Sequence, residues 1–99
     1  MDVSSEAGLT LDQRTTILRV AASHGARNIR VFGSTARGSG TSESDLDLLV
    51  DMEPGRSLLD LIAIEQDLAD QLPMRVDVLT EAGLSPYMRD RVLHEAIAL

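Results

Sequence analysis

Two aspartates and a glycine–serine pair are the residues of this 99-residue chain that are best suited to chemistry. Asp45 and Asp47 lie two positions apart in a segment that reads as a strand, so both carboxylates should share one face. Gly33 permits a tight turn, and Ser34 after it is a favoured helix N-cap, a combination that leaves backbone N–H groups free for phosphate. Two carboxylates beside a phosphate cradle predict a divalent metal held between the protein and a nucleotide.

A third acid, Asp77, follows in the apolar segment 75–79. The ordered set of Gly33-Ser34, then Asp45-x-Asp47, then Asp77 resembles the signature of the polymerase-beta-like nucleotidyltransferase superfamily. The order is what makes the motif specific, because an Asp-x-Asp or a Gly-Ser pair by itself is common.

The fuller strings are similar to those of one group within that superfamily. GSTARG at 33–38 followed by SDLDL at 44–48 looks like the minimal nucleotidyltransferases, which are small stand-alone domains. Many of these are antitoxins paired with a HEPN-domain ribonuclease toxin. The resemblance covers roughly residues 29–99, most of the chain.

The resemblance implies a role for each acid. Asp45 and Asp47 would hold two Mg²⁺ ions, and Asp77 would complete the ion nearest the attacking hydroxyl and accept its proton. The substrate implied is ATP. These three aspartates are therefore the expected catalytic and metal-binding residues.

Nucleotide binding is expected at the turn. Gly33 and Ser34 would hold the β- and γ-phosphates, and Arg37 would add a charge-assisted contact. Arg37 could equally well pair with Glu43 or a nearby aspartate. The Gly/Ser-rich segment 38–44 is either a plain linker or a lip that settles when nucleotide binds.

Two functions follow from the resemblance. In the first, the protein is a Mg²⁺-dependent nucleotidyltransferase, an antitoxin that transfers AMP from ATP to a hydroxyl, expected to be a tyrosine, of a HEPN-type toxin. In the second, it is a binding antitoxin that blocks its toxin by contact and needs no catalysis. Transfer to RNA or to a small molecule fits less well, because the chain is short and acidic.

Composition limits the remaining chemistry. The chain has no cysteine and no lysine, which excludes disulfides, thiolate metal sites, Schiff bases and a Walker lysine. A net charge of −7 argues against non-specific nucleic-acid binding, so no direct nucleic-acid contact is expected, and it suits a basic partner protein or simply solubility. The acidic N-terminus lacks an apolar run and no stretch could span a membrane, so the cytoplasm is expected.

The pattern of elements predicts one domain over residues 1–99, with 1–9 as a loose lead-in. Helices are expected from the Thr10 cap to His24, from 58 to 72 and from Ser85-Pro86 onward, and strands at 28–32, 45–52 and 75–80. This order indicates an α/β (α+β) fold, a small mixed β-sheet flanked by helices. The resemblance implies the polymerase-beta-like nucleotidyltransferase fold.

Apolar stripes at helical spacing mark the helix faces that should be buried. The first helix should bury Leu11, Ile17, Leu18 and Ala21, and the second Leu58, Leu61, Ile62, Leu68, Ala69 and Leu72. In the last helix, Tyr87, Met88, Val92, Leu93 and Ala96 should face the core or a partner.

Other polar residues are expected to lie outside the site. His24 is interpreted as a surface residue, and Asp67 as part of a solvated helix face. Asp51 lies about 13 Å from Asp47 along the strand, too far to share a metal. Arg30 could contact phosphate, although a solvent-facing strand residue is the simpler interpretation.

Overall fold

The computed structural model describes residues 9–33 and 45–99. Its elements are α1 (Leu11–Ser23), β1 (Ala26–Phe32), β2 (Leu46–Met52), α2 (Leu58–Gln71), β3 (Val76–Leu79), the 3-10 helix η2 (Glu81–Gly83), α3 (Pro86–Glu95) and β4 (Ile97–Ala98). The predicted α/β (α+β) class is confirmed. Sequence analysis did not predict η2 or β4, and it began the first strand two residues too late.

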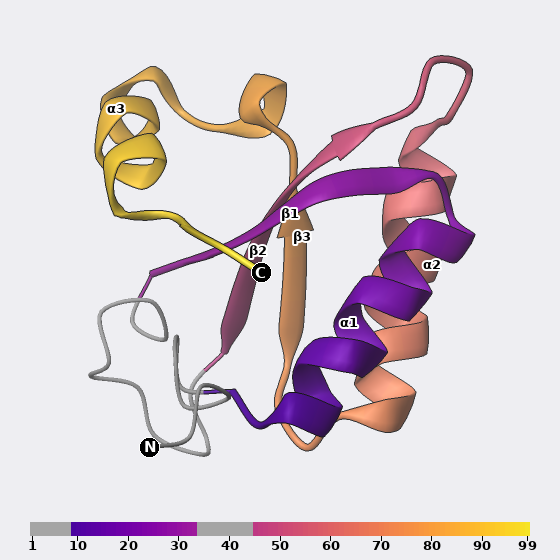
Figure 1. Cartoon of the computed structure of the whole chain (residues 1–99). Helices are drawn as coiled ribbons and strands as arrows, with labels where there is room; N and C mark the ends of the chain where they lie inside the picture. Colours follow the sequence, from indigo (N-terminus) through magenta and orange to yellow (C-terminus); the bar gives the residue numbers. More distant parts are fainter. Residues whose placement is uncertain (1–8, 34–44) are drawn as a thin grey trace.

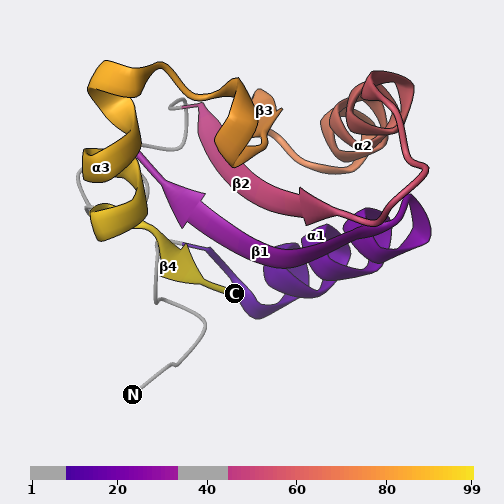
Figure 2. The same ribbon diagram turned by 90° about the horizontal axis from the view of Figure 1, so that it is seen from above.

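The strands form one mixed sheet in the order β3-β2-β1-β4; Figure 1 labels β1, β2 and β3, and Figure 2 labels all four strands. β1 is antiparallel to both β2 and β4, whereas β2 and β3 are parallel. A parallel neighbour needs a crossover, because the chain must return to the starting end of the sheet. α2 provides that crossover, and it places β3 at the edge of the sheet, beside the strand that carries Asp47.

The two faces of the sheet are covered differently. α1 and α2 lie against one face, and α3 lies against the other (Figure 2). The larger core forms under α1 and α2 and includes the fully buried Ile17, Leu48, Ile64 and Leu68. A smaller core under α3 consists of Phe32, Leu49, Leu84 and Val92. The aspartates lie on the face covered by α3, where Asp47 and Asp77 are half-buried and Asp45 is exposed.

The helix starts follow the predicted capping chemistry. Thr10 Oγ1 accepts a hydrogen bond from the N–H of Gln13 at 3.1 Å, and Gln13 Oε1 accepts one from the N–H of Thr10 at 3.0 Å. This reciprocal pair is the capping box expected from the sequence. Ser85 likewise caps α3, with Pro86 at the first position of the helix.

The predicted apolar stripes were only partly right. α2 buries Ile64 and Leu68, whereas Leu58 is 68% exposed and Ile62 39% exposed. Each residue advances about 100° around a helix, so Ile62 lies about 160° from Ile64 and cannot face the same core. Apolar residues lie on both sides of α2, and the spacing alone could not choose between them.

α1 and α3 also leave apolar side chains exposed, in α3 at positions that were expected to face the core or a partner. Leu11 in the first turn of α1 is 56% exposed, and α1 buries Ile17, Val20 and Ala21. α3 buries Val92, whereas Tyr87 is 98% exposed, Met88 40% and Leu93 37%.

Among the residues that the structure describes, no helix is long and apolar enough to cross a membrane.

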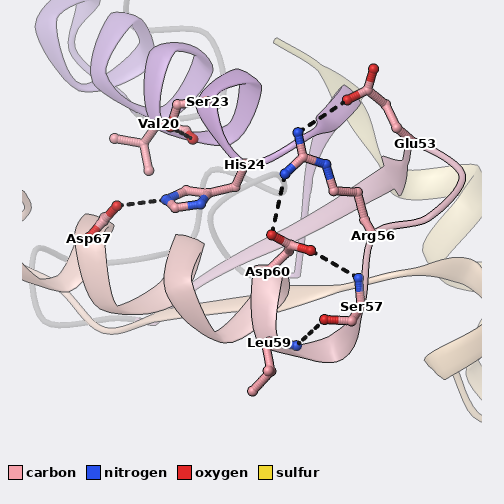
Figure 3. Close-up of polar contacts among 9 residues, drawn as sticks. All are labelled: Val20, Ser23, His24, Glu53, Arg56, Ser57, Leu59, Asp60 and Asp67. Carbon is pink, nitrogen blue, oxygen red and sulfur yellow. Dashed lines mark hydrogen bonds and ion pairs between the residues drawn. The ribbon is translucent and has the colours of Figure 1, made fainter.

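The interpretation of Asp67 as an ordinary solvated acid was wrong. Its Oδ2 lies 2.8 Å from Nε2 of His24, the C-cap residue of α1 (Figure 3). The contact is half-buried and joins α1 to α2. His24 is therefore a structural residue between two helices and not a free surface side chain.

Candidate active site

Asp47 and Asp77 are directly paired neighbours in the sheet. The parallel register of β2 and β3 places Asp47 opposite Asp77. The residues flanking each of them in sequence are buried in the core under α1 and α2, namely Leu46, Leu48, Val76 and Val78. Both aspartates therefore point to the opposite face, on strands about 4.8 Å apart. Two acids far apart in sequence meet at one place.

Burial and repulsion act together on Asp47. Its pKa is raised above the ordinary value of 3.8, first by burial and then by the negative charges of Asp77 and Asp45. Asp45 lies immediately before β2 and is exposed. The carboxylates are thus close enough to repel each other, an arrangement that a bound cation would relieve.

Gly33 occupies the turn that follows β1, next to Asp47. Its φ angle is +78°, in the left-handed region that favours glycine. A Cβ atom built on Gly33 would lie 2.5 Å from Oδ2 of Asp47. Glycine is therefore required here for the backbone and also for space, because any side chain would push on the carboxylate.

The remaining predicted site residues, Ser34 and Arg37, lie outside the described residues, as does the segment 38–44. Within 9–33 and 45–99, no group of three or more His, Cys, Asp or Glu side chains is arranged as a metal site. Mg²⁺ in nucleotide-binding enzymes usually takes one or two carboxylates together with substrate phosphates. The hard oxygen ligands of Asp47 and Asp77 fit that pattern.

Asp51 shares a face with Asp47 but belongs to a different cluster. Its Oδ1 lies 3.0 Å from Nη2 of Arg30, and its Oδ2 accepts a hydrogen bond from Nδ2 of Asn28 at 2.9 Å. Arg30 also lies 3.8 Å from Glu81 and is only 14% exposed. Asp51 is thus engaged in a structural ion pair, in keeping with its exclusion from the site. The Arg30 guanidinium is directed toward the carboxylates of Asp51 and Glu81.

One contact beside Asp77 was not anticipated. The backbone N–H of Val78 donates to Oε2 of Glu65 on α2 at 2.8 Å. A glutamate on a helix gives no sequence signal of such a role, because most helical acids are solvated. Only the placement of α2 against the edge of β3 reveals it.

Comparisons with known proteins identify the family. Residues 15–99 match the model of the nucleotidyltransferase domain. A protein of Thermococcus cleftensis named protein adenylyltransferase MntA is 38% identical over 96 residues, covering 92% of this chain and 97% of that one. A Methanocaldococcus jannaschii protein provisionally named a protein adenylyltransferase, MJ0435, is 40% identical over 81 residues, covering 82% of this chain and 87% of its own.

Solved structures agree on the fold. A structure provisionally described as a minimal nucleotidyltransferase has a TM-score of 0.79 and 45% identity, covering 100% of this chain and 97% of that one. A toxin–antitoxin crystal structure with AMP-PNP has a TM-score of 0.73 at 21% identity, covering 89% of this chain and 72% of that one. The chain belongs to the nucleotidyltransferase domain family, and its fold is the predicted polymerase-beta-like one.

Proposed function

We propose that this nucleotidyltransferase is a Mg²⁺-dependent protein adenylyltransferase that moves AMP from ATP to a protein hydroxyl. The observation that carries the proposal is the register pairing of Asp47 with Asp77, two mutually repelling acids beside the Gly33 turn. The relatives named as protein adenylyltransferases support the choice of AMP and of a protein acceptor.

In this proposal the acceptor oxygen attacks the α-phosphorus of ATP. A new bond forms between the acceptor oxygen and the α-phosphorus. The bond between the α-phosphorus and the oxygen that bridges to the β-phosphate breaks, and pyrophosphate leaves with the electron pair of that bond. Asp77 takes the proton from the attacking hydroxyl, so that the nucleophile is an alkoxide or phenoxide at the moment of attack. The products are the AMP-modified acceptor protein and pyrophosphate.

Two Mg²⁺ ions would be held by Asp45, Asp47 and Asp77, and would neutralise the charge on the attacking and leaving oxygens. The raised pKa of Asp47 supports this assignment, because mutual repulsion and burial both favour a nearby positive charge. Gly33, Ser34 and Arg37 would bind the nucleotide phosphates. The space that Gly33 leaves beside the Asp47 carboxylate is consistent with a nucleotide approaching at this turn.

The acceptor we propose is a tyrosine of a HEPN-type toxin, with this protein as its cytoplasmic antitoxin. Related folds occur in crystal structures described as toxin–antitoxin MntA-HpeT complexes, one of them a Y104A mutant. The net charge of −7 favours a basic protein partner over direct contact with nucleic acid or an anionic membrane surface. The whole chain would act as a single minimal nucleotidyltransferase domain.

A second function is favoured by one observation, the exposed apolar side chains of α3. Tyr87, Met88 and Leu93 are 98%, 40% and 37% exposed and suit a partner surface. Contact alone would then neutralise the toxin. If the Asp45→Asn/Asp47→Asn variant still protects cells from the toxin, contact is sufficient. If protection is lost while the complex still forms, catalysis is required.

The proposal is tested by incubating the protein with Mg²⁺ and α-labelled ATP in a lysate of its own host. We expect a labelled protein band with the native chain and none with the Asp45→Asn/Asp47→Asn variant. The identity of the band gives the acceptor. Equal labelling by both proteins would contradict the assignment of the aspartates.

A further inference from the structure

β3 is the strand that carries Asp77, and it is held in the sheet on one side. It comprises Val76–Leu79, and within the described residues it pairs with β2 but with no strand beyond it. The N–H of Leu46 donates to the carbonyl of Arg75 at 2.8 Å, so residue 75 faces β2. Successive residues of a strand alternate, and the N–H of Val78 therefore points away from β2, toward the open edge.

Glu65 satisfies that outward N–H. Its Oε2 accepts the hydrogen bond from Val78 at 2.8 Å in a half-buried setting. Glu65 is firmly placed, because its helical neighbours Ile64 and Leu68 are fully buried in the core. An ionised acceptor makes roughly twice as strong a hydrogen bond as a neutral one. The carboxylate thus ties the edge strand to α2 at the residue that follows Asp77.

The hydrogen bond holds a strand that carries one of two mutually repelling acids. Asp77 and Asp47 are paired neighbours whose negative charges repel each other, and the repulsion tends to drive β3 away from β2. A four-residue edge strand has few ladder hydrogen bonds with which to resist it. The contact with Glu65 lies on the outer side of β3, so it does not pull β3 toward β2. It fixes the edge strand to α2, and thereby fixes the position of β3 in the sheet, at the residue next to Asp77.

We propose that Glu65 is a positioning residue, which sets the distance between the Asp47 and Asp77 carboxylates by fixing β3 to α2. The inference rests on the proposed function, because it concerns the geometry of the Mg²⁺ ligands. Glu65 itself does not touch metal or substrate in this account. Its effect on metal binding passes through the Val78 N–H and the backbone of β3.

The chain offers a matched control on the same helix. Asp67 is also a carboxylate of α2 with a half-buried 2.8 Å contact, but its partner is His24 on α1 (Figure 3). Glu65→Ala and Asp67→Ala each remove one such contact, and both should lower the melting temperature. Glu65→Gln keeps an acceptor oxygen for Val78. Glu65→Asp keeps the charge but shortens the reach, and it serves if Glu65→Ala fails to fold.

Binding of Mn²⁺ by the full chain with AMP-PNP, followed by electron paramagnetic resonance, is the main readout. Loss of a residue that supports metal ligands typically costs 10–100-fold in metal affinity. We therefore expect the Mn²⁺ dissociation constant to rise at least about tenfold in Glu65→Ala and Glu65→Asp. It should stay near the native value in Glu65→Gln and Asp67→Ala. Amide hydrogen exchange at Val78 should accelerate in Glu65→Ala and Glu65→Asp only.

The possible results distinguish a failure of the proposed function from a failure of the positioning role of Glu65. If the native protein binds no Mn²⁺ with AMP-PNP, both the proposed function and this inference are overturned. If the native protein binds Mn²⁺ and Glu65→Ala or Glu65→Asp binds it equally well, only the positioning role is overturned. An equal loss in Asp67→Ala would also overturn it, since the effect would then be one of general stability.

Discussion

Gly33 leaves the space that the Asp47 carboxylate occupies: a Cβ atom at position 33 would lie 2.5 Å from Oδ2 of Asp47. The strand register brings the two together, because Phe32, the residue before Gly33, pairs with Asp47 across β1 and β2. The conformation of the turn and the position of the Asp47 carboxylate therefore depend on each other. A side chain at position 33 should displace the Asp47 carboxylate and so change the proposed metal site.

Gly33→Ala should lose nucleotide and metal binding as well as stability. Its φ angle of +78° costs an L-residue about 1–2 kcal/mol, and the new methyl group must also displace the carboxylate. Gly55→Ala is the matched control, because Gly55 has φ +88° and no atom within 4 Å of a Cβ there. Calorimetric titration of both variants with Mg²⁺ and AMP-PNP should show lost binding for Gly33→Ala alone. Equal binding by the two would contradict the steric role of Gly33.

Asp47→Asn should stabilise the protein near neutral pH in the absence of metal. The pKa of Asp47 is raised in the folded state, so the folded protein binds this proton more tightly than the unfolded chain does. The favourable contribution of the group is complete below its unfolded value of 3.8 and is lost as the pH rises through the folded pKa. The ionised carboxylate therefore destabilises the native fold at neutral pH.

Melting temperatures measured from neutral to acidic pH check this sign. The advantage of Asp47→Asn over the native protein should shrink as the pH falls toward 3.8. Asp51→Asn is the control with the opposite expectation, because Asp51 pairs with Arg30 at 3.0 Å and its loss should destabilise. A native protein more stable than Asp47→Asn near neutral pH, without metal, would rule out a repulsive site.

Mg²⁺ with ATP should raise the melting temperature of the native chain. A ligand that binds only the folded state at 100 times its dissociation constant stabilises by about 2.7 kcal/mol. For a domain of this size that corresponds to roughly 10 °C or more. Asp47→Asn should lose most of the shift, since the ligand that holds the metal is gone. An unchanged shift in Asp47→Asn would place nucleotide binding elsewhere.

Arg30→Met should reduce stability by about 1 kcal/mol and leave nucleotide binding intact. The ion pair of Arg30 with Asp51 is worth only that much because Asp51 is 43% exposed to solvent. Arg30 lies near the site on the same face, so phosphate contact is the competing expectation. Urea unfolding gives the stability, and titration with AMP-PNP separates the two expectations. Weakened AMP-PNP binding in Arg30→Met would show that Arg30 reaches the nucleotide.

The sequence was a good guide where the determinants of structure are local. Asp47 could be placed on the strand face opposite Leu46 and Leu48 because side chains alternate with a period of two. Asp45, predicted as the first residue of that strand, lies immediately before β2. The caps at Thr10 and Ser85 could be placed because each depends on a few adjacent residues. The order of helices and strands along the chain also predicted a mixed sheet correctly.

Features that depend on contacts between distant segments could not be predicted from the sequence. That Asp77 lies opposite Asp47, and not one or two residues away, follows from how α2 carries the chain back to the sheet. Only the motif order suggested that meeting. The contacts of Glu65 with Val78 and of Asp67 with His24 also join distant segments. β4 has only two residues and forms through its pairing with Arg30 and Val31, so no local pattern announces it.

The most direct test of the account compares transfer rates with the acceptor protein recovered from labelling. The rate of AMP transfer is measured for the native chain, Asp47→Asn, Asp77→Asn and Asp51→Asn. Asp51 is the matched control, an acid on the same face of β2 that pairs with Arg30. We expect losses of at least about 100-fold in Asp47→Asn and Asp77→Asn, as removal of a catalytic acid–base group alone costs that much, and near-native transfer by Asp51→Asn. Transfer by Asp77→Asn at the native rate would contradict the claim that the paired aspartates form the catalytic centre.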